Sequence, residues 1–172
     1  MSIKYTAEEK QKYFDGLPKK HMATGAIMFD RKNRLLIVKP TYKDGWTIPG
    51  GVVDADESPR TACIREVKEE VSLDITDPTL LCVDYVTAGS YEYLGENLRK
   101  PEVFQFVFDG GILSDGQISD IRIQEEELSE YRFVTIDEAL KLLRANLALR
   151  IPKCLEAIES GRVCYLENGE KV

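Results

Sequence analysis

The sequence predicts an α/β (α+β) fold in which a mixed β-sheet lies between helices on its two faces. Segments with the apolar patterns of β-strands recur along the 172-residue chain, and segments with helix caps and helical periodicity separate them. Strands flanked by helices in this way pack as a sheet covered by helices. Because no internal repeat or linker divides the chain, residues 1–172 are expected to form a single domain.

The first third of the chain predicts one helix and three strands. Residues 6–14 form a short polar helix before a glycine-proline turn. The apolar segments over 21–30 and 34–40 are expected to pair as a hairpin around the turn "DRKN". Residues 45–51, "GWTIPGG", are expected to form a short apolar strand that runs into a pair of glycines.

The next helix has clear boundaries in the sequence. It is expected to begin at Pro59, with Ser58 as its N-cap, and to end at Val71. Ser72 then follows the helix, at a position where the backbone is often left-handed and glycine is usual. A non-glycine residue costs about 1–2 kcal/mol in that conformation, so Ser72→Gly is expected to stabilise the fold.

The second half of the chain predicts further strands and two helices. Strands are expected over 80–93 and 102–111, joined by a polar loop over 94–101, and another over 131–136. The remaining elements are a helix over 137–146, which starts with a capping box at Thr135 and Glu138, and a helix over 152–160.

Composition excludes several classes of partner. The chain carries 23 Lys and Arg against 30 Asp and Glu, a formal charge of −7, whereas nucleic-acid polymers and anionic membranes are bound by basic patches. No segment has the length of a transmembrane span or the apolar stretch of a signal peptide. The four scattered cysteines lack zinc-site spacing and are expected to be free thiols. A cytoplasmic protein that binds no nucleic-acid polymer and no membrane is expected.

Three glutamates of the 59–71 helix raise an electrostatic problem. At about 100° per residue, Glu66, Glu69 and Glu70 form one stripe at the border of the apolar face, where like charges repel each other. A divalent cation removes this cost, since Mg²⁺ and Mn²⁺ bind carboxylate oxygens and share them with phosphates. The two glycines, Gly50 and Gly51, allow the backbone to approach such a site closely. The alternative is an ordinary solvated acidic face.

Residues 50–73, "GGVVDADESPRTACIREVKEEVSL", resemble the signature of the Nudix hydrolases (the MutT-like family). That signature is a glycine, five residues, a glutamate, seven residues, then Arg-Glu-aliphatic-x-Glu-Glu-x-Gly-aliphatic. Ser72 departs from it, because the family has glycine there. A weaker likeness extends over the flanks to about Val134. The matching positions are Gly51, Glu57, Arg65, Glu66, Val67, Glu69, Glu70 and Leu73.

The resemblance implies a Nudix fold and a metal-dependent pyrophosphohydrolase that cleaves a nucleoside diphosphate linked to another moiety. The cofactor would be Mg²⁺ or Mn²⁺, and the substrate a small phosphoanhydride such as a nucleotide or nucleotide-sugar. In addition to binding the metal, Glu66 would accept the proton of the attacking water. Glu57 would assist from its loop, and Arg65 would orient the carboxylates. The metal ligands implied are the Gly50 carbonyl, Glu66, Glu69 and Glu70.

Members of this family often carry one more glutamate on a loop before a later strand. The segment "QEEELSEYRFV" supplies four candidates here, and Glu127 is favoured because it directly precedes the lead into the strand. A solvated acidic loop is the alternative for each of them. The four candidates are Glu125, Glu126, Glu127 and Glu130.

Substrate-binding residues are expected on the next strand and its loop. Tyr91 and Tyr93 share one strand face and would line a cleft, and Arg99 or Lys100 would meet phosphate. Two other functions stay open: a catalytically silent Nudix domain that senses a nucleotide, and an isomerase of short prenyl diphosphates. The isomerase would need its own cysteine and glutamate constellation, which the sequence lacks. A homodimer is one option for the assembly.

Overall fold

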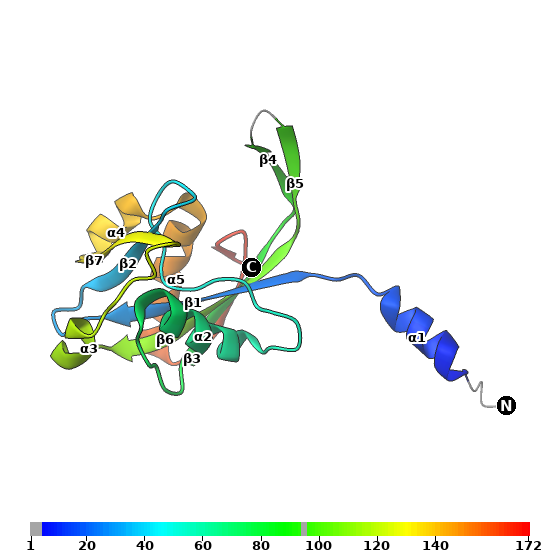
Figure 1. The fold of residues 1–172 in the computed structure, drawn as a ribbon, viewed down its shortest axis with the longest axis horizontal. Helices are drawn as coiled ribbons and strands as arrows, with labels where there is room; N and C mark the ends of the chain where they lie inside the picture. Colours follow the sequence, from blue (N-terminus) through cyan, green and yellow to red (C-terminus); the bar gives the residue numbers. More distant parts are fainter. Residues whose placement is uncertain (1–4, 94–95) are drawn as a thin grey trace.

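The computed structural model describes residues 5–93 and 96–172, without the side chains of residues 90–93 (Figure 1). In chain order the elements are α1 (Ala7–Asp15), β1 (His21–Phe29), β2 (Leu35–Pro40), α2 (Pro59–Val71), β3 (Thr79–Val86), β4 (Gly89–Tyr93), β5 (Glu96–Lys100), β6 (Val103–Ile112), α3 (Asp115–Ser119), β7 (Leu128–Val134), α4 (Ile136–Leu142), α5 (Ala145–Ser160), β8 (Cys164–Glu167) and β9 (Glu170–Lys171).

A mixed sheet of seven strands forms the centre of the fold, in the order β7-β2-β1-β6-β3-β8-β9. The pairs β1–β6 and β3–β8 are parallel, and the other neighbours are antiparallel. One buried apolar cluster joins the sheet to α2 and α3, and the other joins it to α4 and α5. Both faces are therefore covered by helices, which confirms the predicted fold class.

The segment over residues 46–52 lies between β1 and β2 and forms bridges instead of a regular strand. The two strands pair directly only at Phe29 and Leu35. Thr47 then bridges to Val38 of β2, while Val52 bridges to Ala23 of β1. The predicted hairpin is therefore confirmed only near its turn. Farther from the turn, β1 and β2 form backbone bridges to residues 46–52 instead of to each other.

The segment over residues 79–101 differs from the prediction. The expected strand over 80–93 is divided into β3 and β4, and the expected loop over 94–101 contains β5. Strands β4 and β5 form a separate two-stranded sheet that projects from the body (Figure 1). Because β5 is polar and mostly exposed, it has no alternating apolar pattern from which a strand could be predicted.

The last two helices also differ from the prediction. The helix expected over 137–146 ends at Leu142, because the extended backbone of Leu143 pairs with Trp46. Helix α5 then begins at Ala145, seven residues before the predicted start, and contains Pro152 in its interior. Burial of its apolar face, including Ile151 at 0% exposure, offsets the hydrogen bond that proline removes.

The predicted N-terminal helix and the predicted bounds of α2 are confirmed. Helix α1 begins with a capping box between Thr6 and Glu9, and Ser58 caps α2, with Pro59 as its first residue. Figure 1 shows α1 standing away from the sheet, and all of its residues are exposed. Among the described residues, no helix has the length and apolar character needed to span a membrane. All four cysteines are free thiols.

Ser72 is left-handed, as predicted, with φ of 61°, but its hydroxyl donates a 3.0 Å hydrogen bond to the Arg122 carbonyl. Ser72→Gly would relieve the backbone cost and lose this bond, and the two effects have similar size, about 1 kcal/mol each. We therefore expect Ser72→Gly to leave the free energy of unfolding nearly unchanged, in place of the gain expected from sequence. Ser72→Ala keeps the strain and loses the bond, so it should be about 1 kcal/mol less stable by urea denaturation. Equal stability of the alanine variant and the wild type would contradict this account.

Candidate functional site

The glycine turn, Gly50 and Gly51, packs directly against β1 and α2. Gly50 has φ of 145°, and a Cβ added to it would lie 2.5 Å from the Gly25 Cα. A Cβ on Gly51 would lie 2.5 Å from the carboxyl carbon of Glu66. Gly50 therefore requires glycine, whereas a Cβ at Gly51 would displace the Glu66 carboxylate, and the backbone of both residues faces the acidic side of α2 without any intervening side chain.

Glu70 is the buried carboxylate of the site. It is 5% exposed and accepts a 2.8 Å hydrogen bond from the Gly50 amide. Burial, together with the negative charges of Glu66 and Glu127, raises the pKa of Glu70 to about 7, while the hydrogen bond from the Gly50 amide opposes this shift. Near neutral pH the site therefore holds a carboxylate, Glu70, whose negative charge is not fully balanced by the neighbouring groups.

Glu66 is less deeply buried than Glu70, with its side chain 13% exposed. Its carboxylate contacts the Arg65 guanidinium at 3.0 Å. Partial burial raises the pKa of Glu66, with further increases from the charges of Glu69 and Glu127, and the Arg65 charge opposes these effects. A carboxylate with a raised pKa is a better proton acceptor than an exposed one.

Arg65 connects the loop before α2 with the helix itself. It donates to Glu57 at 3.0 and 3.1 Å, to Glu69 at 2.9 Å and to the Val52 carbonyl at 3.1 Å. Hydrogen bonds to Glu57 are the main cause that raises the pKa of Arg65, and the same contact lowers the pKa of Glu57. Glu69 itself is mostly exposed. The acidic stripe is thus divided into an outer carboxylate and two inner ones.

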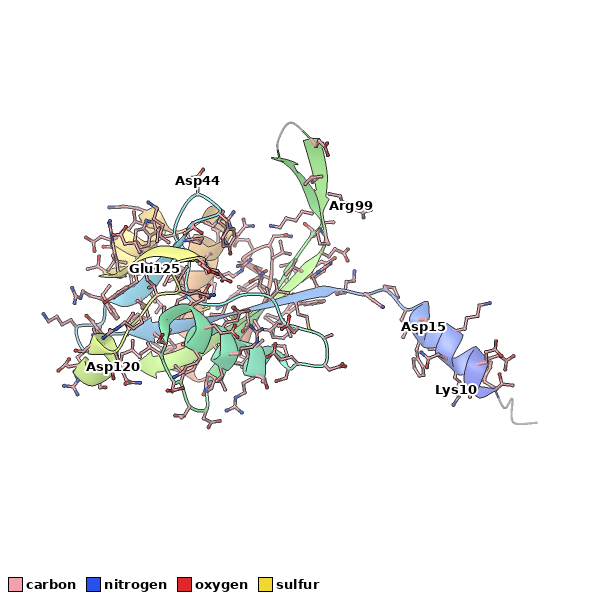
Figure 2. All side chains as sticks on the ribbon, viewed as in Figure 1. Lys10, Asp15, Asp44, Arg99, Asp120 and Glu125 are labelled. Carbon is pink, nitrogen blue, oxygen red and sulfur yellow. The ribbon has the colours of Figure 1, made fainter. Side chains whose placement is uncertain are left out.

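The loop before β7 brings one glutamate near the inner carboxylates. The charge of Glu127 acts on both Glu66 and Glu70, as their raised pKa values show. Glu130 instead pairs with Arg132 at 2.6 Å within β7. Glu125, Glu126 and Glu127 are all exposed, and Figure 2 locates Glu125 on this loop.

The carboxylate oxygens of the site are suitable ligands for a hard divalent cation, although they are not arranged around one common position. Within the part of the chain that the structure describes, no three carboxylate, thiol or imidazole groups form a ready metal site. Arg65 accounts for this, because it holds Glu66 and Glu69 toward its guanidinium. Glu66 and Glu70 nevertheless both reach the glycine turn, where the missing Cβ of Gly51 leaves room for the Glu66 carboxylate. Oxygen donors of this kind suit Mg²⁺ or Mn²⁺.

A cavity of about 470 Å³ opens beside the glycine turn, and both glycines contribute to its wall. Lys100 lines this cavity, whereas the neighbouring Arg99 lines no part of it and extends from the hairpin in Figure 2. The side chains of Tyr91 and Tyr93 lie outside the described residues, so their role stays a prediction. Sequence reasoning missed Lys43 and Arg144, which also line the cavity, since no local pattern marks either of them.

Comparison with known proteins identifies relatives that differ in length. The chain is 37% identical over 71 residues to the mRNA-decapping enzyme subunit 2 of Saccharomyces cerevisiae, a match covering 41% of this chain and 7% of that protein. It therefore spans only a small part of the yeast relative. It is 26% identical over 134 residues to the RNA pyrophosphohydrolase of Campylobacter jejuni subsp. doylei, a match covering 72% of this chain and 81% of that one.

Solved structures share the fold. The MutT protein from Methanosarcina mazei Go1 superimposes with a TM-score of 0.59 at 22% identity, covering 86% of this chain and 99% of that one. The sequence profile of the NUDIX domain matches residues 19–157, which include β1, the glycine turn, all of α2 and the loop with Glu127. Since this match covers well over half of the chain, the protein belongs to the NUDIX domain family.

Proposed function

We propose that the protein is a hydrolase of phosphoanhydride bonds that cleaves a nucleoside diphosphate linked to another group, with Mg²⁺ or Mn²⁺ as cofactor. The main support is one juxtaposition: the inner carboxylates Glu66 and Glu70 meet the glycine turn, which forms part of the wall of a cavity. The cavity volume lies in the range of small-molecule sites, about 300–1,000 Å³. We further propose that residues 1–172 act as one domain.

The residues of the site have different roles in the proposed hydrolysis. Glu66, half-buried and with a raised pKa, accepts the proton of the attacking water. Glu70 and the Gly50 carbonyl, together with Glu69 and Glu127, supply oxygen donors for the cation. When bound, the cation neutralises charge on the phosphate oxygens and makes the water more acidic. Arg65 forms hydrogen bonds to both Glu57 and Glu66 and so fixes their relative positions, which limits the motion of the proton acceptor Glu66.

A small phosphoanhydride remains the favoured substrate over a polymer. The chain has a net charge of −7, which opposes association with a long polyanion. A second candidate, a phosphoanhydride carried by RNA, is favoured by the relative named an RNA pyrophosphohydrolase. Both candidates present adjacent phosphates to the same residues, so one assay can compare them.

A substrate screen tests the proposed function. Nucleoside triphosphates, nucleotide-sugars, dinucleotides and a 5′-triphosphorylated RNA would be incubated with Mg²⁺ or Mn²⁺, and the products separated by chromatography. We expect cleavage at a phosphoanhydride bond, dependence on the cation, and little turnover of phosphomonoesters, which have one phosphate only. Tight nucleotide binding measured by calorimetry, with no product in any assay, would instead favour a catalytically silent domain that senses a nucleotide.

A further inference from the structure

The cavity beside the glycine turn is lined by cationic side chains from three separate segments. Lys43 comes from the loop after β2, Lys100 from the end of β5, and Arg144 and Arg150 from the start of α5 and its second turn. None of the lining residues is acidic, although the whole chain has an excess of acidic residues. The charge of this cavity is therefore opposite to that of the neighbouring α2 surface.

Arg150 is already balanced by a partner within the protein. It is 7% exposed and pairs with Asp84, which is fully buried and also accepts a 3.0 Å hydrogen bond from the Gly169 amide. Its charge belongs to a buried structural ion pair in the wall of the cavity. By contrast, none of the ion pairs found among the described residues involves Lys43 or Arg144.

Arg144 is positioned by the loop that carries Lys43. Its amide donates to the Trp46 carbonyl at 3.2 Å, and a Cβ on Gly45 would lie 3.1 Å from its Cγ. Gly45 has φ of 84°, a conformation that favours glycine, so this loop makes room for the Arg144 side chain. The two cationic residues thus lie on segments that are bound to each other.

Lys43 lines the cavity from the loop after β2. Its ammonium group is 4.9 Å from the centre of the Tyr42 ring, and its charge lowers the pKa of Glu70. In Figure 2, Asp44 at the tip of the same loop points outward. A substrate group that enters the cavity from the glycine turn would therefore meet Lys43 and Arg144.

We propose that Lys43 and Arg144 form a binding site for an anionic group of the substrate, a phosphate or a carboxylate, that lies outside the cleaved phosphoanhydride. This inference rests on the proposed function and names the substrate class more closely. An ammonium and a guanidinium that take part in none of the ion pairs among the described residues gain charge-assisted hydrogen bonds from such a group. An uncharged sugar in the same place offers no comparable gain, so the site selects substrates with a further negative charge.

Two matched substrate pairs test the inference and distinguish the sources of charge. UDP-glucuronate and UDP-glucose differ by one carboxylate, and NADP and NAD differ by one phosphate. We expect the more acidic member of at least one pair to have the higher kcat/KM, by about tenfold for one charge-assisted contact. The same preference should be found in dissociation constants measured by calorimetry in EDTA, where no turnover occurs.

Variants connect the preference to the two residues. Arg144→Gln and Lys43→Gln should each reduce the preference toward unity, and Arg144→Lys, which keeps the charge, should retain part of it. Lys141→Gln is the matched control, because Lys141 is exposed on α4 and does not line the cavity. Circular dichroism would verify that each variant is folded.

The outcomes separate this inference from the proposed function. Absence of turnover for every substrate, with selective binding of the acidic member in EDTA, would overturn the hydrolase proposal and support the anion site. Equal binding and equal kcat/KM within both pairs would overturn the anion site and leave hydrolysis intact. A preference that persists undiminished in Arg144→Gln and Lys43→Gln would also overturn the inference.

Discussion

Glu66→Gln is expected to reduce kcat by about 10²–10⁴, because the substitution removes the proposed proton acceptor while preserving side-chain volume. Glu66 combines the features that this role requires: partial burial, a raised pKa and direct contact with the glycine turn. Steady-state kinetics on the best substrate of the screen would measure the loss. Glu159→Gln is a suitable control, since Glu159 is an exposed residue near the end of α5.

The wild-type pH profile supplies an independent check of the same role. Because burial raises the pKa of Glu66, the fraction of its carboxylate able to accept a proton should increase through the mildly acidic range. The wild-type kcat should therefore rise with pH in that range, and Glu66→Gln should lose this part of the rise while keeping the part that follows from ionisation of Glu70, whose pKa is about 7. An unchanged kcat in Glu66→Gln would assign the proton transfer to another group.

Glu70→Gln is expected to stabilise the protein in EDTA at pH 8 while weakening its response to divalent cations. The folded protein raises the pKa of Glu70 from 4.5 to about 7, so the native state holds the proton more tightly than the unfolded chain. The free energy of unfolding therefore falls as pH increases from about 4.5 to about 7, and the full cost of the buried charge is present above that window. At about 1.4 kcal/mol per pKa unit, this cost is about 3 kcal/mol.

Urea denaturation at pH 5 and pH 8 would measure this effect. Glutamine is uncharged at both values and its carbonyl can still accept from the Gly50 amide, so the variant should show the smaller pH dependence. Mg²⁺ or Mn²⁺ should raise the melting temperature of the wild type through preferential binding to the folded state, and of the variant much less. A variant that is less stable than the wild type at pH 8 in EDTA would contradict the proposed burial cost. An equal response to cations would contradict the proposed role of Glu70 in binding them.

The local elements with strong boundary signals were predictable from sequence. Ser58 and Pro59 define the start of α2, and the left-handed Ser72 follows its end, because caps and helix-ending conformations depend on neighbouring residues. The spacing of Glu66, Glu69 and Glu70 on this helix followed from the same periodicity. The family signature also led us to expect all three glutamates beside Gly50 and Gly51; the structure brings Glu66 and Glu70 there and leaves Glu69 exposed beside Arg65.

The elements that failed were those decided by contacts distant in sequence. Strand β5 has little apolar pattern, and its pairing with β4 alone makes it a strand. The break at Leu143 results from its pairing with Trp46, almost one hundred residues earlier. Pro152 indicated a helix start, but the burial of Ile151 on the sheet extends α5 through it.

The sequence by itself determined the family signature, the bounds of α2 and the stripe of three glutamates, because each depends on residues within a few turns of one another. Only the tertiary structure decided how those glutamates differ. Glu70 is buried against the Gly50 amide and Glu69 is exposed beside Arg65, a distinction set by packing between α2 and the glycine turn. The approach of Lys43 and Arg144 to one cavity was likewise decided by tertiary structure, because no local pattern connects a loop after β2 with the start of α5.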